Sequence, residues 1–450
     1  MNRRLQRRLT AVGAFLALLV PSQAGAQQQK EWTWTDASGH ARTRAELDKV
    51  FAEHILWLKS GESRGTRADL SSAHLTYADL VGAELNSADL IGARLVGADL
   101  TNADLVGADL VGADLMGAHL NGTSLNDADL TDAHLSDGDL TDAHLARADL
   151  SQAYMNTANL TRAVLDSANL SGAHLLSTNL TRASLNRADL TRASLNRADL
   201  TRVELVGAEL KDAHFSDADL QDATFEPNST PELRSIATAR HLELVTYQTN
   251  PDALAQLRKQ FQENGFRTQE RKITYALSRR KAELDGPVER WFQRMAFDLT
   301  CQYGMNPGRA LQIWLALLLF CWLAYAVFIH VPGESGIYRL QKTGGPTAKE
   351  EIEEQIRPRT IPSRPLWRYP VRFIHQELRV FFWAGFFSLM SAFNIGFRDI
   401  NFGRWLRLLP RTEYDLKAKG WARTVAGFQS LISVYLIALW VLTYFGRPFE

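Results

Sequence analysis

A five-residue period constrains this chain more than any other feature, and it runs without insertion or deletion from residue 66 to residue 226. When positions 70, 75, 80 and onward to 225 are taken as the centres of the units, 29 of the 32 centres are leucine. Alanine occupies 28 of the 32 positions two residues before a centre, and the residue between the two is Asp or Asn in 16 units. Residues 181–200 even spell the same ten letters twice. A fixed short period of this kind predicts a solenoid.

The length of the period decides which solenoid is possible. Five residues match neither the 3.6-residue period of a helix nor the two-residue period of a strand. They fit a coil with flat sides, in which the central Leu and the preceding Ala point inward and the other three residues point outward. Asp and Asn favour turns, so we expect them at the corners. Four sides close a square of 20 residues, which stacks Leu165, Leu185 and Leu205 in one column.

Runs such as "ADLVGADLMGAHL" (108–120) match the A-(D/N)-L-x-x signature of the pentapeptide-repeat family. Over residues 66–226 the chain therefore resembles that family, as a membrane-linked member. The resemblance implies a right-handed quadrilateral β-helix, and 32 units at four per coil give eight coils. It also implies an N-terminal capping helix within residues 27–65, since "HILWLKSGESRG" (54–65) is similar to the cap of membrane-linked members. We interpret His54 as a packed residue of this cap, and Phe215 and Phe225 as large rings that seal the other end.

The N-terminus has the layout of a secretory signal peptide over residues 1–26. Four arginines precede an apolar stretch from Leu9 to Val20, and Ala24-Gly25-Ala26 forms a small-residue cleavage site. An uncleaved N-terminal anchor is the alternative. Cys301 and Cys321 are the only two cysteines, and because Cys321 lies in an apolar run we expect neither a disulfide nor a metal site.

The outward positions of the repeat carry charge in an uneven pattern. Between Thr66 and Glu226 there are 25 acidic and 10 basic residues, with the arginines gathered in the C-terminal third. We interpret this surface as a soluble, aggregation-resistant wall, and the alternative is that the basic belt is a docking surface. The belt comprises Arg162, Arg182, Arg202, Arg187, Arg192 and Arg197. Six outward histidines have the wrong spacing for a metal site, and no catalytic set or phosphate-binding loop is present. The sequence predicts no enzyme, metal or cofactor.

The rest of the chain reads as an α-helical membrane domain. Residues 227–309 are expected to form a helical collar that ends in an interfacial helix, and residues 310–331 and 425–445 to cross the membrane. Between the two spans we expect a cytoplasmic loop (332–379), a re-entrant or interfacial segment (380–397) and a basic loop (398–424). The basic residues before the second span place this region inside, and the tail (446–450) outside.

The segment "SAFNIGFRDI" (391–400), which lies between two spans, resembles the filter region of two-span pore-loop channels of the potassium-channel type. The resemblance implies pore-lining roles for one run of residues, although Arg398 stands where the family has a second glycine. The pore-loop candidates are Asn394, Ile395, Gly396, Phe397, Arg398 and Asp399. A vestigial or repurposed pore domain is our interpretation, and currents in reconstituted bilayers would test it.

Three functions remain open. The leading hypothesis is a bacterial inner-membrane protein that displays its exported, periplasmic repeat domain as a scaffold for a protein partner. The second is an ion channel or channel-like pore. The third, implied by DNA-mimic members of the family, is a topoisomerase-binding protein, although an exported domain would not meet DNA enzymes. The expected partners are the lipid bilayer, an unknown protein and a second copy of the chain, and we expect no nucleic acid.

Overall fold

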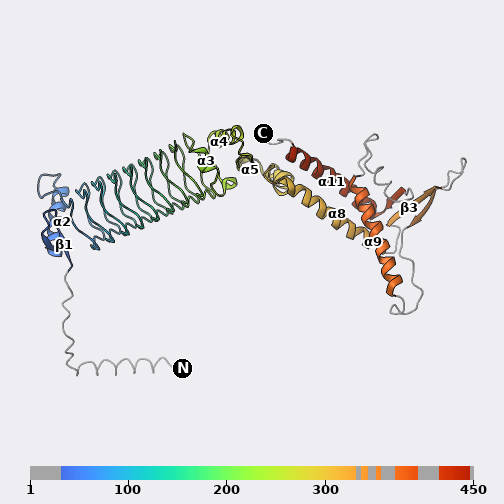
Figure 1. Ribbon diagram of the computed structural model, residues 1–450, viewed down its shortest axis with the longest axis horizontal. Coiled ribbons are helices and arrows are strands. Elements are labelled where there is room, and N and C mark those ends of the chain that lie inside the picture. Colours follow the sequence, from blue (N-terminus) through green and yellow to red (C-terminus); the bar gives the residue numbers. More distant parts are fainter. Residues whose placement is uncertain (1–31, 331–335, 343–350, 356–369, 394–414, 446–450) are drawn as a thin grey trace, which may run out of the picture. The chain divides into compact units, whose positions relative to one another are not determined.

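The computed structural model describes residues 32–330, 336–342, 351–355, 370–393 and 415–445 (Figure 1). The chain divides into two compact units, Met1–Val164 with Ala168–His174, and Leu165–Ser167 with Leu175–Glu450. Five-residue units of the repeat occur in both. The predicted signal peptide and the C-terminal tail lie outside the described residues.

Each five-residue unit makes one turn and one single-residue bridge. In the unit centred on Leu95, the Ala98 N–H donates to the Leu95 carbonyl at 3.0 Å, and Gly97 between them has φ +64°. A positive φ at the third residue of a turn is the type II geometry. The second residue after a centre is left-handed at all 31 corners from Ser72 to Asp222, and 22 of these corners carry a residue other than glycine.

The expectation that Asp and Asn occupy the corners was wrong. These residues lie one position before the centre, where they form the bridges between coils on the flat sides. Their side chains still help the turn, because the carboxylate accepts the N–H two residues further on, as in Ser71 N–H to Asp69 at 3.1 Å. The residue that turns the chain is therefore the last of the unit.

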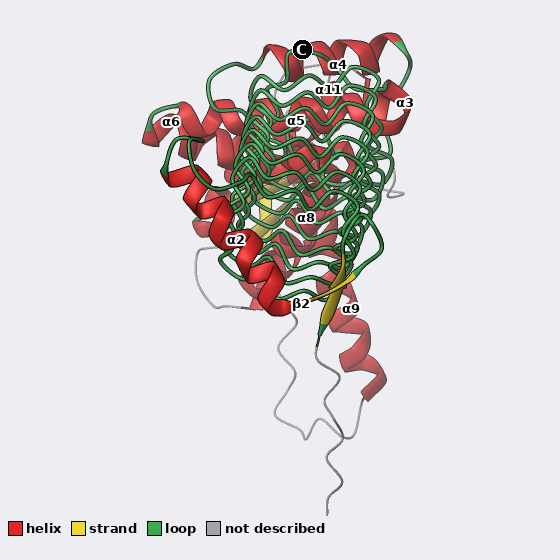
Figure 2. Cartoon of the chain, turned by 90° about the vertical axis from the view of Figure 1, so that its left-hand side faces the viewer, coloured by secondary structure: helices red, strands yellow, loops and turns green. Residues whose placement is uncertain are grey.

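The predicted 20-residue coil is confirmed by the hydrogen bonds between coils. In the first of the two compact units, Asp89 bridges Asp69 and Asp109 in parallel, and the Leu90 N–H donates to the Asp109 carbonyl at 2.7 Å. In the second unit, the Leu185 N–H donates to the Glu204 carbonyl at 2.9 Å in the same way. Figure 2 shows the coils as loops in successive layers, because only one residue per side is extended.

The inward positions form the core. All 32 unit centres are buried, and so are the small residues two positions earlier except Ala83, which is half-buried. Thr123 replaces one of these alanines, and its hydroxyl donates to the Leu100 carbonyl at 2.8 Å. Leu and Ala thus fill most of these inward positions, which confirms the inward register.

The N-terminal segment contains a hairpin that the sequence analysis missed. Strands β1 (Thr33–Thr35) and β2 (Ala41–Thr43) pair antiparallel and lead into helix α2 (Arg44–Lys59), at the blue end of Figure 1. A capping box begins α2, since Thr43 and Glu46 each accept the other's backbone N–H. Strand β1 also pairs with the first coil, where the His74 N–H donates to the Thr35 carbonyl at 2.8 Å.

His54 joins α2 to the first coil, as expected of a packed residue. Its ring is fully buried and stacks on Trp57, with the ring centroids 5.5 Å apart. Nδ1 accepts the Ala68 N–H at 3.0 Å, so the imidazole is neutral in this contact. Burial lowers the pKa of His54 from its ordinary value of 6.5.

The predicted helical collar does not begin directly after the repeat. Residues 227–249 instead follow one more irregular coil, with the bridges Asp219↔Arg240 and Thr224↔Thr246. This coil contains only helix α3 (Leu233–Ile236) and the 3-10 turn η1 (Leu242–Leu244). Backbone groups of the last repeats form hydrogen bonds with this irregular coil. The polar sequence after Glu226 did not predict it.

The collar proper consists of α4 (Asp252–Glu263) and α5 (Arg267–Leu284). Leu254, Leu257 and Phe261 form an apolar stripe on α4, and all three are buried. Short helices follow as α6 (Pro287–Gln293), the π-helical turn η2 (Arg294–Asp298) and α7 (Leu299–Cys301). Trp291, Phe292, Met295 and Leu299 are about half exposed or more on this stretch, which fits the predicted interfacial helix.

Three long helices make up the last part of the chain: α8 (Pro307–His330), α9 (Pro370–Phe393) and α11 (Trp421–Phe445). Among the described residues, stretches of α8 (Pro307–Ile329) and α11 (Trp421–Tyr444) are long and apolar enough to cross a membrane. Both helices begin a few residues before the predicted spans, because Pro307 and Trp421 open them.

Two predictions for the region between the spans need correction. The loops of 332–379 and 398–424 contain a three-stranded antiparallel sheet of order β4-β3-β5, built from β3 (Gly336–Lys342), β4 (Glu351–Gln355) and β5 (Asp415–Lys419). The described part of the predicted re-entrant segment belongs to α9, which is one continuous helix that starts ten residues earlier. Helix α9 packs on α8 and α11, where Gln429 accepts from the Tyr325 hydroxyl at 2.9 Å and donates to Ser388 Oγ at 2.9 Å.

We expect Leu150→Arg to lower the free energy of unfolding by about 3–5 kcal/mol, because it places an unpaired charge in a fully buried position. The substitution Gln152→Ala in the same coil is the control. Gln152 is exposed, and glutamine and alanine both place a Cβ at this left-handed corner, so the backbone strain does not change. This substitution should change the free energy by less than about 0.5 kcal/mol. Urea unfolding followed by circular dichroism measures both, and equal losses would contradict the register.

Acid should loosen α2 from the first coil through His54. Because its pKa is lower in the folded protein, the contribution of neutral His54 is complete above about pH 6.5 and is lost as the pH falls below that value. Hydrogen exchange of the peptides around Ala68, normalised for intrinsic rates, should therefore speed up towards pH 5. His54→Gln keeps an acceptor but does not titrate, so a pH response that survives in this variant would contradict the assignment.

Candidate interaction surfaces of the repeat domain

The side chains that project furthest from the repeat domain are those at its corners. Four of the predicted docking arginines occupy four successive corners of one coil in the second unit, each with φ close to +60°. All four side chains are exposed, and among the described residues none of them forms an ion pair. They are Arg182, Arg187, Arg192 and Arg197. Their guanidinium groups are thus available to a partner.

The other two predicted arginines are engaged. Arg162, in the first unit, holds Asp142 of the neighbouring coil, with Nε 2.6 Å from the carboxylate. This contact lowers the pKa of Asp142 and raises that of Arg162. Arg202 lies 3.9 Å from Asp222, which Arg279 of α5 also approaches at 3.6 Å. The predicted belt therefore separates into paired arginines and one ring of unpaired arginines, a distinction that the sequence could not make.

Two sides of this coil combine arginine corners with an uncharged face. Arg192 and Arg197 flank the side that carries Ser194 and Asn196. The opposite side, between Arg182 and Arg187, carries Ser184 and Asn186. The remaining sides carry Asp189 and Asp199, which lower the local positive charge. Ser184 and Asn186 donate hydrogen bonds to the carboxylates of Asp166 and Glu204 in the adjacent coils, so an acidic partner would meet less competition on the side between Arg192 and Arg197.

The first of the two compact units has a net negative charge, in contrast to the arginine-bearing coil. Between Trp32 and Val164 there are 20 acidic and nine basic residues. One flat side carries five aspartates in consecutive coils, and each accepts the N–H two residues further on at 2.9–3.2 Å. They are Asp69, Asp89, Asp109, Asp129 and Asp149. Hydrogen bonds from Ser71 lower the pKa of Asp69, so this side is negative at neutral pH.

A stack of aromatic rings on another flat side went unrecognised in the sequence. The rings of His134, Tyr154 and His174 lie over one another, with centroids 4.8 and 4.7 Å apart. The shared column of the three residues is visible in the sequence, where Tyr154 separates His134 from His174 and argues against a metal site, but the stacking of the rings was not predicted. The rings stack because parallel coils place equivalent side chains directly above one another.

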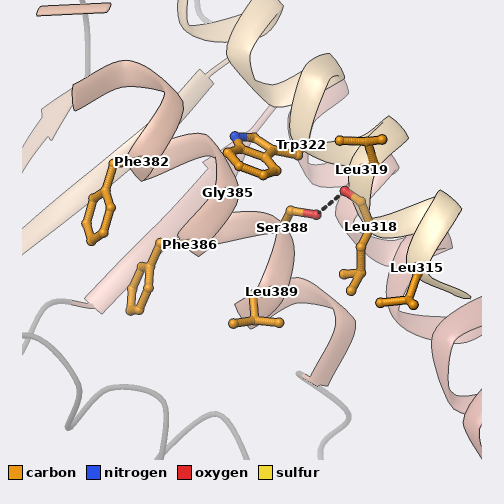
Figure 3. Close-up of a pocket in the computed structure, with 9 residues that line it drawn as sticks. All are labelled: Leu315, Leu318, Leu319, Trp322, Phe382, Gly385, Phe386, Ser388 and Leu389. Carbon is orange, nitrogen blue, oxygen red and sulfur yellow. Dashed lines mark hydrogen bonds between the residues drawn. The ribbon is translucent and has the colours of Figure 1, made fainter. Parts of the chain in front are cut away.

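The helical part offers one apolar groove between α8 and α9 (Figure 3). Its volume is about 460 Å³, and Leu315, Leu319, Phe382 and Phe386 line its walls. Gly385 is required at its base, because a Cβ there would lie 2.8 Å from the Trp322 ring. No titratable side chain lines the groove, so it has no groups for acid–base chemistry. The pore-loop candidates Asn394 to Asp399 lie outside the described residues and stay a prediction.

Comparison with known proteins agrees with the repeat. The family model described as pentapeptide repeats matches in eight copies between residues 66 and 226. Among solved structures, HetL, a pentapeptide repeat protein involved in heterocyst differentiation regulation in the cyanobacterium Nostoc, is 30% identical. The match covers 45% of this chain and 97% of HetL, with a TM-score of 0.21.

Two further structures are similar over the same region. A second pentapeptide repeat protein from Nostoc is 34% identical, over 22% of this chain and 82% of its own, with a TM-score of 0.21. QnrB1, a plasmid-mediated fluoroquinolone resistance protein, is 22% identical over 35% of this chain and 72% of its own, with a TM-score of 0.28. No curated protein matches the chain.

The family repeat implies a right-handed quadrilateral β-helix, which agrees with the four-sided, 20-residue coils described above. Proteins of this kind act by binding rather than by catalysis. Through residues 66–226 the chain belongs to the pentapeptide repeat family.

Proposed function

We propose that the protein is a membrane-anchored scaffold whose repeat domain binds an acidic surface of a protein partner. The observation that carries this proposal is the ring of four unpaired arginines on successive corners of one coil. Each of them adopts the left-handed conformation at a position where glycine would be less strained. Neither packing nor ion pairing within the described residues accounts for their presence, whereas recognition of carboxylates would.

In this proposal the repeat forms eight coils, with the hairpin and α2 closing the first. The hairpin and α2 supply partners to the backbone groups of that coil. Thr35 pairs with His74, the Trp32 indole N–H donates to the Thr76 carbonyl at 3.2 Å, and the Arg44 side chain donates to the Asp79 carbonyl. Covering such open backbone groups prevents edge-to-edge association.

The anchor in this proposal is the helical part. Helices α8 and α11 have the length and composition of spans, and the exposed apolar residues of α6 and η2 fit a position at the membrane surface. A bacterial inner membrane with the repeat domain in the periplasm agrees with the basic N-terminus and the basic residues that precede α11. The partner would then be another exported or membrane protein.

Labelling of introduced cysteines tests the orientation. Both natural cysteines are buried, so the background should be low. Gln152→Cys places a thiol at an exposed corner, and we expect a membrane-impermeant maleimide to label it in intact spheroplasts. Leu150→Cys, buried in the same coil, is the matched control and should react only after denaturation. Labelling of Gln152→Cys only after lysis would contradict an exported repeat domain.

Binding of polyglutamate to the full chain in detergent tests the arginine ring. We expect Arg192→Gln and Arg197→Gln each to weaken binding about two- to five-fold, the worth of one exposed ion pair, and to leave stability unchanged. Arg147→Gln is the control, because Arg147 already holds Asp127 at 2.6 Å. It should lower stability and leave polyglutamate binding unchanged. The reverse pattern would show that the ring is structural.

A further inference from the structure

A hollow lies beside the first coil, where the residue before β1, the end of β2, the start of α2 and a corner of the repeat meet. Its volume is about 720 Å³. Seven residues line it: Trp32, Thr43, Arg44, Ala45, Asp48, Tyr77 and Asp79. We call this site the N-terminal hollow. Two aromatic side chains and two carboxylates around one cavity are a combination that the scaffold function does not use.

Tyr77 is placed there against the preference of the repeat. It is the only aromatic residue at any of the 31 corners, and its φ is +56°. Side chains with a Cβ strain this conformation, and bulky ones most of all. Tyr77 nevertheless stays 73% exposed, so it does not occupy the corner in order to fill a core. A strained and exposed aromatic residue points to a binding role.

The next coil makes room for this ring. A Cβ at Gly97, the equivalent corner 20 residues later, would lie only 2.4 Å from Tyr77 Cε1 and 2.6 Å from Cδ1. The phenol ring can rest on this coil because position 97 has no side chain. Trp32 is fixed beside it, since its indole N–H donates to the carbonyl of Thr76 at 3.2 Å. Both aromatic groups are thus held at the hollow before any ligand arrives.

The charges around the hollow select the sign of the ligand. Arg44 is already engaged, because its Nε lies 2.8 Å from Asp48 and its Nη1 donates to the Asp79 carbonyl. Within the part of the chain that the structure describes, the Asp79 carboxylate accepts one hydrogen bond, from the Val81 N–H at 3.3 Å. One carboxylate charge therefore stays uncompensated among the lining residues, inside an acidic unit. An anion would find no free cationic donor in the lining, whereas a cation would find a carboxylate.

We propose that the N-terminal hollow binds an organic ammonium group. Aromatic faces attract such cations through the negative charge of the ring, and a carboxylate completes the attraction. The Trp32 and Tyr77 rings would contact the apolar substituents of the ammonium group, and Asp79 would balance its charge. The site is independent of the arginine ring and of the membrane helices, so it can be tested separately from the scaffold function.

Titration of the full chain in detergent micelles with tetramethylammonium chloride tests the proposal by calorimetry. We expect saturable binding that neither sodium chloride at equal ionic strength nor tert-butanol, a neutral molecule of similar size, reproduces. Loss of one ring in Tyr77→Ala should weaken binding about 2- to 30-fold, the range of one cation–π contact. Tyr77→Phe keeps the ring and should retain the affinity.

The carboxylate is tested with a matched pair of variants. Asp79→Asn should weaken binding. Asp89→Asn is the control, because Asp89 occupies the same position of a five-residue repeat but does not line the hollow, and it should leave binding unchanged. Urea unfolding of each variant shows that it is folded. Absence of saturable binding, equal binding of tert-butanol, or equal losses in Asp79→Asn and Asp89→Asn would overturn the proposal.

Discussion

The parallel hydrogen bonds between residue n and residue n + 20 are the constraint on which the repeat domain depends. In the first unit they join Leu90 to Asp109, and in the second they join Leu185 to Glu204. Since buried backbone groups must be paired, a single inserted residue would leave a whole side without partners. This explains why 32 units follow one another with no change of length. It also means that residues spaced 20 positions apart in the sequence lie directly above one another in the structure.

The corners of the coils carry the side chains to which we assign binding roles. Each coil has to turn four times, and each turn places one residue in the left-handed conformation at a cost of about 1 kcal/mol or more if it is not glycine. Glycine is used at nine of the 31 corners, and Gly97 among them gives space to the Tyr77 ring. Of the other 22 corners, all but Ser87 and Asp222 carry side chains that lie exposed. Among them, the unpaired arginines and Tyr77 are the corners to which we assign a binding role.

The helical part follows different rules. Helices α8, α9 and α11 pack through apolar side chains such as Tyr325, Ala384 and Phe387, and a buried chain of hydrogen bonds through Gln429 joins all three. In an apolar surrounding such polar contacts fix which helices associate, because the alternative is an unpaired polar group. Within the described residues, α9 is therefore a packing partner of the two candidate spans rather than a separate loop.

By itself, the sequence determined the 20-residue coil, the inward register and the approximate positions of α8 and α11. Each of these follows from a local period or from an uninterrupted apolar stretch, which the chain states directly. Only the tertiary structure decided what depends on neighbours distant in the sequence. It paired β1 with the first coil, added the irregular coil of residues 227–249 and joined β3 and β5 into one sheet. It also decided which arginines are paired and brought Trp32 to Tyr77, because such contacts form between residues that no short pattern links.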